Sequence, residues 1–444
     1  MTPANNPAIN WEAYRRAVEE AKTISVQGVV TQVIGMVIEG QGPGMAVGGI
    51  CEIDLKNNGS SISAEVVGFR NDRVLLMPLG EMRGIEPGSR IRLKQQSPNI
   101  KTGQKLLGRV IDGLGNQIDQ KDRIEYETDY PLYAEPLNPL LRERISEPVD
   151  VGIRAINGLI TIGKGQRIGI MSGSGVGKSV LMGMIARHTA ADISVIALIG
   201  ERGREVREFI ERDLGEAGLR RSVVVVATSD QPPLIRMRGA YLATAIAEYF
   251  RDTGKDVILM MDSITRFAMS YREVGLAIGE PPTSRGYTPS VFAQLPKLLE
   301  RAGTKRGGGS ITGIYTVLVE GDDMNEPIAD ASRSIIDGHI VLSRDLANEN
   351  HYPAIDILGS ISRVMRDITG ENQRKNAKKL INILATYRKA EDLINIGAYV
   401  KGSNPKIDYA IKMIDKVNAY LQQEVEERVS YGESAAQLAA LFAG

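Results

Sequence analysis

The 444-residue sequence contains a single cysteine, Cys51. One thiol permits neither an intrachain disulfide nor a cysteine metal cluster, and we interpret Cys51 as a small buried apolar residue. The chain has no excess of positive or negative charge, because Lys and Arg total 54 and Asp and Glu also total 54. A formal net charge of zero gives the chain no overall attraction to nucleic acid or to an anionic membrane.

Long apolar runs are also missing from the sequence. The first residues, MTPANNPAINWEAYRR, have no apolar stretch behind a basic start. Nowhere do the roughly 18 consecutive apolar residues of a membrane-spanning helix occur. We therefore expect neither secretion nor a membrane span, and predict a soluble intracellular protein.

The first two of four predicted segments are residues 1–23 and 24–97. The first contains an amphipathic helix from about residue 10 to 22, in which Asn10 caps the helix and Trp11 lies on the apolar face. This face either packs on the protein's own next domain or binds a partner. The second segment alternates short β-rich runs with glycine-containing turns, which predicts a small closed β-barrel. Its strands lack the interleaved aromatic and basic residues of a nucleic-acid stacking platform, so we interpret it as an assembly domain.

The other two predicted segments are residues 98–369 and 370–444. In the first of these, continuous apolar strands alternate with helical stretches, which indicates a doubly wound α/β core with a parallel sheet. The predicted strands are RIGIM, SVIALIG, VVVVA, VILMMD and YTVLV. The last segment has helical spacing of apolar residues, interrupted by GSNP at 402–405. We predict a C-terminal helical domain there and assign no chemistry to it.

A phosphate-binding P-loop follows the strand RIGIM, where the chain reads SGSGVGKS and continues into a helix. Glycines let the loop backbone turn its N–H groups toward phosphate oxygens, and the helix N-terminus favours the same anion. Lys178 supplies positive charge for the β- and γ-phosphates, and the Ser179 hydroxyl is placed to bind Mg²⁺. The strict motif begins with glycine, and a small residue such as Ser172 should still fit there. The predicted ATP-binding residues are Gly173, Ser174, Gly175, Val176, Gly177, Lys178, Ser179 and Val180.

Carboxylates follow three of the predicted strands. Asp262 ends DVILMMD, the apolar strand with a terminal acid that typifies a Walker B element, and it would hold Mg²⁺ through water. Glu201 follows VIALIG and is suited to activate the water that attacks the γ-phosphate, unless it only caps the next helix. Glu320, after YTVLV, is a competing candidate for the base and is ranked lower. Arg363, in SISR, is the candidate arginine finger for the transition-state charge.

These residues resemble one family. The stretch 151–367 is similar to the catalytic core of the rotary ATP synthase α/β subunits, because PAIDILGSIS matches the signature of that superfamily and GERGREVREF resembles the segment with its catalytic glutamate. DSITRFAMSYREVGLAIGEPP, EGDDMNEPIAD and DGHIVLSRDLA look most like the ATPases of type III protein export. The likeness covers nearly the whole chain and favours the flagellar export ATPase over its relative in virulence injectisomes.

The resemblance implies a RecA-like core between a small β-barrel and a helical domain, and an Mg²⁺-dependent ATPase. It assigns Arg202 to the phosphate side, Arg363 to a finger that reaches the adjacent subunit's site, and Tyr352 to adenine stacking. It also implies a homohexameric ring with a stalk-like regulator at the N-terminal segment and a central coiled-coil protein in the pore, faced by the loop around 272–282. Export substrates and chaperones, but no nucleic acid, would be the other partners. The ring would lie in the cytoplasm, at the inner face of the cytoplasmic membrane.

Other readings of the same features stay open. A ring-shaped RNA helicase shares a similar core, but its barrel binds RNA, which the zero net charge and aromatic-poor strands disfavour. An ATP synthase or vacuolar-type subunit would need a second related chain. A nucleotide-bound scaffold without activity does not need Lys178, Glu201, Asp262 and Arg363 together. Because Glu201 and Arg363 lie on one polypeptide, identical chains would complete a site at every interface, and a monomer would be poorly active.

Overall fold

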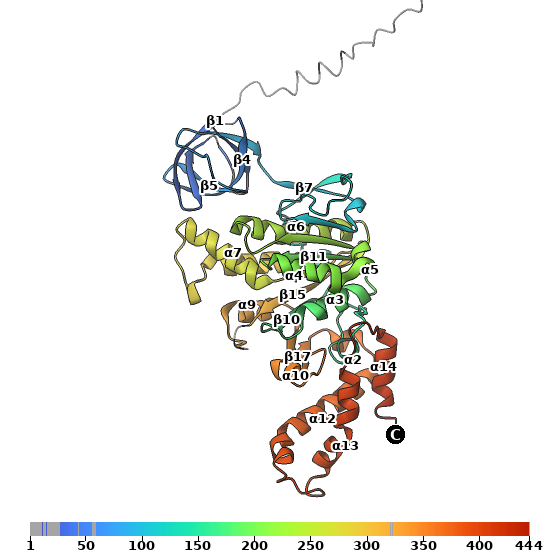
Figure 1. Cartoon of the computed structure of the whole chain (residues 1–444). Helices are drawn as coiled ribbons and strands as arrows, with labels where there is room; N and C mark the ends of the chain where they lie inside the picture. The colour runs from blue at the N-terminus through green and yellow to red at the C-terminus, as the bar shows by residue number, and fades with distance from the viewer. Residues whose placement is uncertain are drawn as a thin grey trace, which may run out of the picture. The chain divides into compact units, whose positions relative to one another are not determined.

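The computed structural model describes residues 11, 15, 27–42, 44–55, 59–319, 321 and 323–443 (Figure 1). The predicted N-terminal helix lies outside the described residues apart from Trp11 and Arg15, and Glu320 also lies outside them. The chain packs as two compact units, Met1–Ser97 and Pro98–Gly444. The four-segment division stays a prediction. Among the described residues, no helix is long and apolar enough to cross a membrane.

The first unit contains a closed antiparallel barrel in the strand order β1-β2-β5-β4-β3-β6, as predicted. Close packing needs glycine at Gly40, where a Cβ would lie 2.4 Å from the Ile91 side chain. Cys51 is fully buried in the barrel core, which confirms its interpretation as an apolar residue. The strands are β1 (Gln27–Ile34), β2 (Val37–Gln41), β3 (Ile50–Asp54), β4 (Ser61–Arg70), β5 (Arg73–Pro78) and β6 (Arg90–Gln95).

The second unit is built on a nine-stranded sheet in the order β17-β16-β10-β15-β13-β11-β12-β8, with β14 paired to β15. All pairings are parallel except those of β14 and β17. Every residue of β11 and β12 is buried, which is why these segments are continuously apolar. The strands are β8 (Arg109–Asp112), β10 (Arg167–Ser172), β11 (Ile193–Ile199), β12 (Ser222–Ala227), β13 (Asp256–Asp262), β14 (Gly303–Thr304), β15 (Ser310–Leu318), β16 (Gly338–Leu342) and β17 (Ile355–Ser362).

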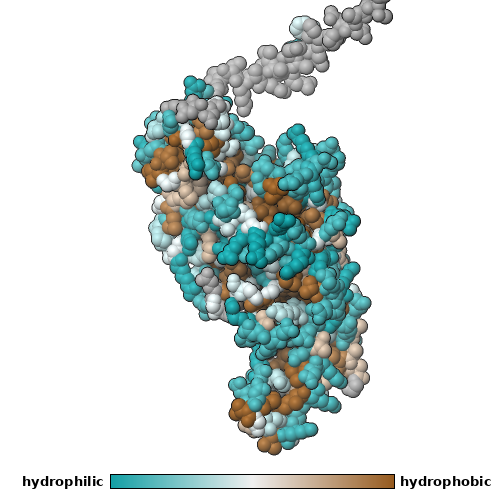
Figure 2. All heavy atoms as spheres, viewed as in Figure 1, coloured by the Kyte–Doolittle hydropathy of each residue, from teal (hydrophilic) through white to brown (hydrophobic). Residues whose placement is uncertain are grey.

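The five predicted apolar segments form β10, β11, β12, β13 and β15 of this sheet, so the parallel α/β core is confirmed. Helices flank the sheet on both sides, with α6 against β11, β12 and β13 (Figure 1). Hydrophilic residues cover most of the visible face of the molecule (Figure 2). The helices of the core are α2 (Arg154–Leu159), α3 (Lys178–His188), α4 (Gly203–Glu208), the π-helix η3 (Phe209–Leu214), α5 (Gly215–Arg220), α6 (Pro233–Asp252), α7 (Ile264–Ala277), α8 (Pro289–Leu299), α9 (Pro327–Ile335), α10 (Arg344–Asn348) and α11 (Met365–Ile368).

Short elements complete the core. A two-stranded antiparallel sheet joins β7 (Asn99–Thr102) and β9 (Thr128–Pro131), and both strands pack against α6. Three single-turn 3₁₀ helices occur in connections of the same unit: η1 (Gln104–Leu106), η2 (Pro139–Leu141) and η4 (Ser284–Gly286).

Three helices follow the core, α12 (Glu371–Asn395), α13 (Pro405–Leu421) and α14 (Tyr431–Ala440). The predicted break at 402–405 separates α12 from α13, because the Asn404 side chain caps α13 and Pro405 occupies its first turn. Ser430 and Glu433 form a capping box that starts α14. Both α13 and α14 pack against α2, so the helical segment is anchored to the α/β core.

Candidate active site at the ends of the parallel strands

The P-loop joins the end of β10 to the start of α3. Gly175 and Gly177 have φ values of +80° and +89°, which residues with a Cβ rarely adopt, and α3 begins at Lys178. Ser172, where the strict motif has glycine, is the last residue of β10 and is 2% exposed. Its side chain therefore fits inside the core, as the sequence predicted. The loop presents the N-terminus of an 11-residue helix to an anion.

Lys178, Glu201 and Asp262 converge at one edge of the sheet. The Lys178 Nζ lies 2.5 Å from Asp262 Oδ1 and 3.5 Å from Glu201 Oε1. Asp262 ends β13 and Glu201 follows β11, and the register pairs Leu198 with Asp262, so both acids leave the carboxyl edge of neighbouring strands. The structure thus brings together the three residues that the sequence placed at strand ends.

Burial and the charges of neighbouring side chains shift the pKa values of Glu201 and Lys178. Burial and the nearby Asp262 carboxylate raise the pKa of Glu201 to about 7. Burial acts to lower the pKa of Lys178, but the charges of Asp262 and Glu201 outweigh it and raise that pKa. Thr316 Oγ1 donates a 2.6 Å hydrogen bond to Asp262 Oδ1, a contact that the sequence gave no reason to expect. A carboxyl group with a pKa near neutrality is poised to exchange a proton under cellular conditions.

An apolar cavity of about 220 Å³ adjoins the P-loop. Tyr352 lines it and lies 3.5 Å from the position that a Cβ on Gly177 would occupy. An apolar cavity beside a phosphate-binding loop, with an aromatic ring in its wall, suits a purine base. The other lining residues from the core are Val176, Val180, Leu181, Met184, Leu342, Pro353 and Ala354.

The same cavity includes Gln423 and Val425, from the chain after α13. The Gln423 backbone N–H donates a 3.0 Å hydrogen bond to the carbonyl of Tyr352. The C-terminal segment, for which the sequence predicted no chemistry, therefore forms part of the wall of this cavity. No local motif could have identified these residues, because about 250 positions separate them from the P-loop and only the fold brings them together.

The two candidate arginines contact groups other than Lys178, Glu201 and Asp262. Arg202 is exposed and its guanidinium lies 3.7 Å from the Glu205 carboxylate. Arg363 follows β17, which runs antiparallel to β16, and Ser362 pairs with Gly338 at the start of β16. Arg363 therefore lies at the amino edge of the parallel strands, roughly 20 Å from the P-loop edge for a six-residue strand such as β10. Its guanidinium donates to the carbonyl of Arg333.

The loop predicted around 272–282 is partly helical, because α7 continues to Ala277. Within α7, the Arg272 guanidinium lies over the ring of Tyr287 at 5.2 Å. The alternation of buried and exposed residues in α7 continues past Arg272. The helix therefore ends only at the turn that contains Gly279, whose φ is positive.

Comparison with known proteins identifies the family. Residues 152–362 match the nucleotide-binding domain of the ATP synthase alpha/beta family, residues 30–93 match its beta-barrel domain, and residues 369–440 match the T3SS EscN ATPase C-terminal domain. The flagellum-specific ATP synthase of Bacillus subtilis is 54% identical, over 93% of this chain and 94% of the relative. The type 3 secretion system ATPase of Xanthomonas euvesicatoria is 48% identical, over 91% of each chain.

The structural comparison agrees with these matches. The assembled ATPase EscN of the enteropathogenic E. coli type III secretion system has a TM-score of 0.88 at 46% identity, covering 93% of this chain and 99% of EscN. EscN in complex with its central stalk EscO has a TM-score of 0.86 at the same identity and coverage. The chain belongs to the ATP synthase α/β family, among the flagellum-specific and type III secretion ATPases.

Proposed function

We propose that this chain hydrolyses ATP as a homohexameric ring that energises or loads substrates for flagellar type III protein export. The observation that carries the proposal is the group Lys178, Glu201 and Asp262 beside the P-loop, next to the apolar cavity of Tyr352. One edge of the sheet thus carries groups suited to bind phosphate, to activate water and to stack on a base.

The residues present fit a magnesium ion that arrives with the nucleotide. Within the described part of the chain, no three acidic, His or Cys side chains are grouped closely enough to hold a metal alone. Mg²⁺ in nucleotide enzymes usually takes one or two protein ligands and completes its shell with phosphate oxygens and water. Ser179 and Asp262 would supply these ligands, and the ion would neutralise charge developing on the phosphates.

The side chains divide the work of hydrolysis among them. Lys178 would turn from Asp262 toward the β- and γ-phosphates when the anion enters. Glu201 in its ionised form would accept a proton from the attacking water at a carboxylate oxygen. Arg202, already at the same strand end, would reach the phosphates from the solvent side. Tyr352 would stack on adenine, in a cavity that Gln423 helps to enclose.

A neighbouring copy of the chain would supply Arg363. The antiparallel course of β17 places this residue at the opposite edge of the sheet from the chain's own P-loop, so it cannot serve that site without a large rearrangement. It is free to serve an adjacent subunit's site in a ring, where each interface would pair one Glu201 with one Arg363. Stabilisation of transition-state charge by an arginine from a neighbour is a recurrent device in nucleotide hydrolysis.

The remaining parts of the proposal concern partners. The complex of EscN with its central stalk EscO supports a central coiled-coil protein in the pore of the ring. A stalk-like regulator would bind residues 1–23, and export substrates and chaperones would dock from the cytoplasm at the inner face of the membrane. An injectisome role is the second candidate, since the Xanthomonas euvesicatoria relative and EscN both belong to type 3 secretion systems.

Two experiments test this function. Steady-state ATP hydrolysis by the purified chain is measured with Mg²⁺ and with a chelator, over a wide range of protein concentration. We expect activity only with Mg²⁺, and a rate per subunit that rises with concentration as rings form. Deletion of the gene in its source organism should abolish flagellar filaments. Normal filaments together with loss of injectisome secretion would instead select the second candidate.

A further inference from the structure

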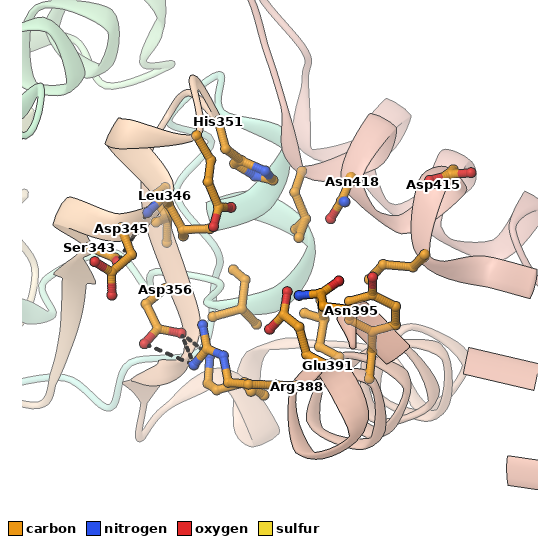
Figure 3. A pocket seen from close by; sticks show the side chains of 18 of the residues that line it. Ser343, Asp345, Leu346, His351, Asp356, Arg388, Glu391, Asn395, Asp415 and Asn418 are labelled. Carbon is orange, nitrogen blue, oxygen red and sulfur yellow. Dashed lines mark hydrogen bonds and ion pairs between the residues drawn. The ribbon is translucent and has the colours of Figure 1, made fainter. Parts of the chain in front are cut away.

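A second and larger cavity lies between the sheet and the C-terminal helices. It measures about 720 Å³ and is bounded by α10 and the start of β17 on one side and by α12 and α13 on the other (Figure 3). This volume is within the range of small-molecule and peptide sites in proteins. The mechanism of hydrolysis uses none of its charged residues.

The charges in this cavity are strongly one-sided. Six carboxylates line it but only one cationic side chain, Arg388, whose guanidinium lies 3.2 Å from Asp356 Oδ1. This ion pair connects α12 to β17 and is visible in Figure 3. Within the described ranges, no cationic side chain forms an ion pair with the other five acids. These are Asp345, Glu349, Glu391, Asp392 and Asp415.

A buried histidine provides an independent sign of a ligand. His351 is only 6% exposed, and its side chain lines the cavity (Figure 3). In the described part of the chain no protein group hydrogen-bonds its ring, and the ring nitrogens are accessible from the cavity. The amide side chains of Asn395 and Asn418 line the same space. A ligand entering the cavity would therefore meet a polar group that the protein itself leaves without a partner.

The arrangement of the acids selects the kind of ligand. Among the described residues, no three acidic or His side chains are close enough to share a metal ion, so the negative charge is spread along the cavity walls. Apolar side chains lie between the acids, among them Leu346, Ile357 and Leu384. Spread charge with apolar intervals matches lysine and arginine side chains, whose long methylene stems pack on apolar surface while their heads meet carboxylates.

We propose that this cavity binds a lysine- or arginine-bearing segment of a partner polypeptide and that its occupancy changes the affinity for nucleotide. The second part rests on the proposed nucleotide site. His351 and Tyr352 are consecutive residues, yet the first lines this cavity and the second lines the apolar cavity beside the P-loop. Leu421 and Gln423 are divided between the two cavities in the same way. Movement of either shared segment, 351–352 or 421–423, would therefore change the shape of the nucleotide cavity.

A binding assay on the full chain without nucleotide tests the first part. Fluorescein-labelled hexalysine is titrated by anisotropy against wild type, Glu391→Gln/Asp392→Asn, and the control Glu135→Gln/Glu216→Gln, which removes two exposed acids outside the cavity. We expect saturable binding by wild type and by the control, and a Kd at least about tenfold weaker for the cavity variant. Equal weakening in both double variants would show non-specific charge attraction and overturn the proposal.

Two further arms sharpen the result. Unlabelled spermine should displace hexalysine only at much higher concentration than unlabelled hexalysine does; equal potency would identify a polyamine site instead of a polypeptide site. His351→Gln, which keeps a polar group, should bind hexalysine more weakly than wild type while retaining the wild-type circular dichroism. If His351→Gln does not fold, Glu391→Gln/Asp392→Asn still tests the proposal.

The coupling is measured separately with a fluorescent ADP analogue. Saturating hexalysine should change its Kd at least about threefold in wild type and leave it unchanged in Glu391→Gln/Asp392→Asn. An unchanged Kd in wild type would overturn the coupling. No arm measures hydrolysis, so failure of the proposed ATPase mechanism would leave the peptide-binding result standing.

Discussion

The ammonium group of Lys178 lies 2.5 Å from Oδ1 of Asp262, so the P-loop lysine is paired with the carboxylate that we assign to Mg²⁺. When nucleotide binds, phosphate would take the place of Asp262 beside Lys178, and Mg²⁺ would take the place of Lys178 beside Asp262. The pair keeps two buried groups of opposite charge compensated, since either one alone would be costly to bury.

The role of Lys178 predicts a loss of catalysis that exceeds any loss of fold. Lys178→Ala should lower kcat/KM for ATP by at least about a hundredfold, the usual cost of removing one preorganised donor from developing charge. Lys375→Ala is the control, because Lys375 is exposed and forms an i,i+4 ion pair with the exposed Glu371. Activity of Lys178→Ala within about tenfold of wild type, with an intact circular dichroism spectrum, would refute the assignment.

The raised pKa of Glu201 predicts the pH dependence of hydrolysis. A base must be ionised to accept a proton, so kcat/KM should rise with pH through about 7 and then level off. Glu205 contributes to raising this pKa, and Glu205→Gln should therefore move the rising limb to lower pH. Glu201→Gln should be nearly inactive at every pH. A wild-type profile that is flat from about pH 5 to about pH 8 would contradict Glu201 as the base.

Tyr352 is expected to contribute binding energy through stacking on adenine. Tyr352→Ala should lose about 1 to 3 kcal/mol of binding free energy. The Kd of a fluorescent ATP analogue should therefore increase by a factor of about 5 to 100. Tyr352→Phe keeps the ring and should bind nearly as well as wild type. Tyr409→Ala is a matched control, since Tyr409 is 47% exposed and Tyr352 is 42% exposed. Equal affinity of Tyr352→Ala and Tyr409→Ala would exclude stacking.

Gln423 connects the C-terminal segment to the nucleotide cavity. Its side chain accepts a 2.7 Å hydrogen bond from the Arg154 backbone and donates to the carbonyls of Gly152 and Glu427. Gln423→Ala leaves these buried groups without partners, at a cost of about 1 to 3 kcal/mol, and should lower both Tm and nucleotide affinity. Gln422→Ala, at an exposed neighbour, should change neither. Reduced Tm with unchanged nucleotide affinity would show that Gln423 is only structural.

The core and its three charged residues could be predicted because the signals are local. The P-loop spacing and the acids at the ends of VIALIG and DVILMMD place Lys178, Glu201 and Asp262 at strand ends, and parallel strands bring those ends together. Gln423 gave no such signal, because its contribution depends on how α13 packs against α2. The extent of α7 beyond Arg272 was missed, since the family likeness indicated a loop there.

Other assignments stay predictions for physical reasons. Arg363 was recognised by likeness, and the fold of one chain explains only why it does not reach its own P-loop. The competing base Glu320 lies outside the described residues, so Glu201 is supported by its own contacts alone. The large acidic cavity was not anticipated, because Asp356 and Glu391 lie 35 positions apart in the sequence and only the packing of α12 against β17 brings them to one cavity.

The central claim, that neighbouring subunits share each catalytic site, is tested most directly by mixing Glu201→Gln with Arg363→Ala and measuring ATP hydrolysis per subunit. Each variant alone should be nearly inactive. In randomly mixed rings about a quarter of the interfaces would combine an intact Glu201 with an intact Arg363, so the mixture should recover up to about a quarter of the wild-type rate. A mixture no more active than the average of its two components would contradict a site shared between subunits.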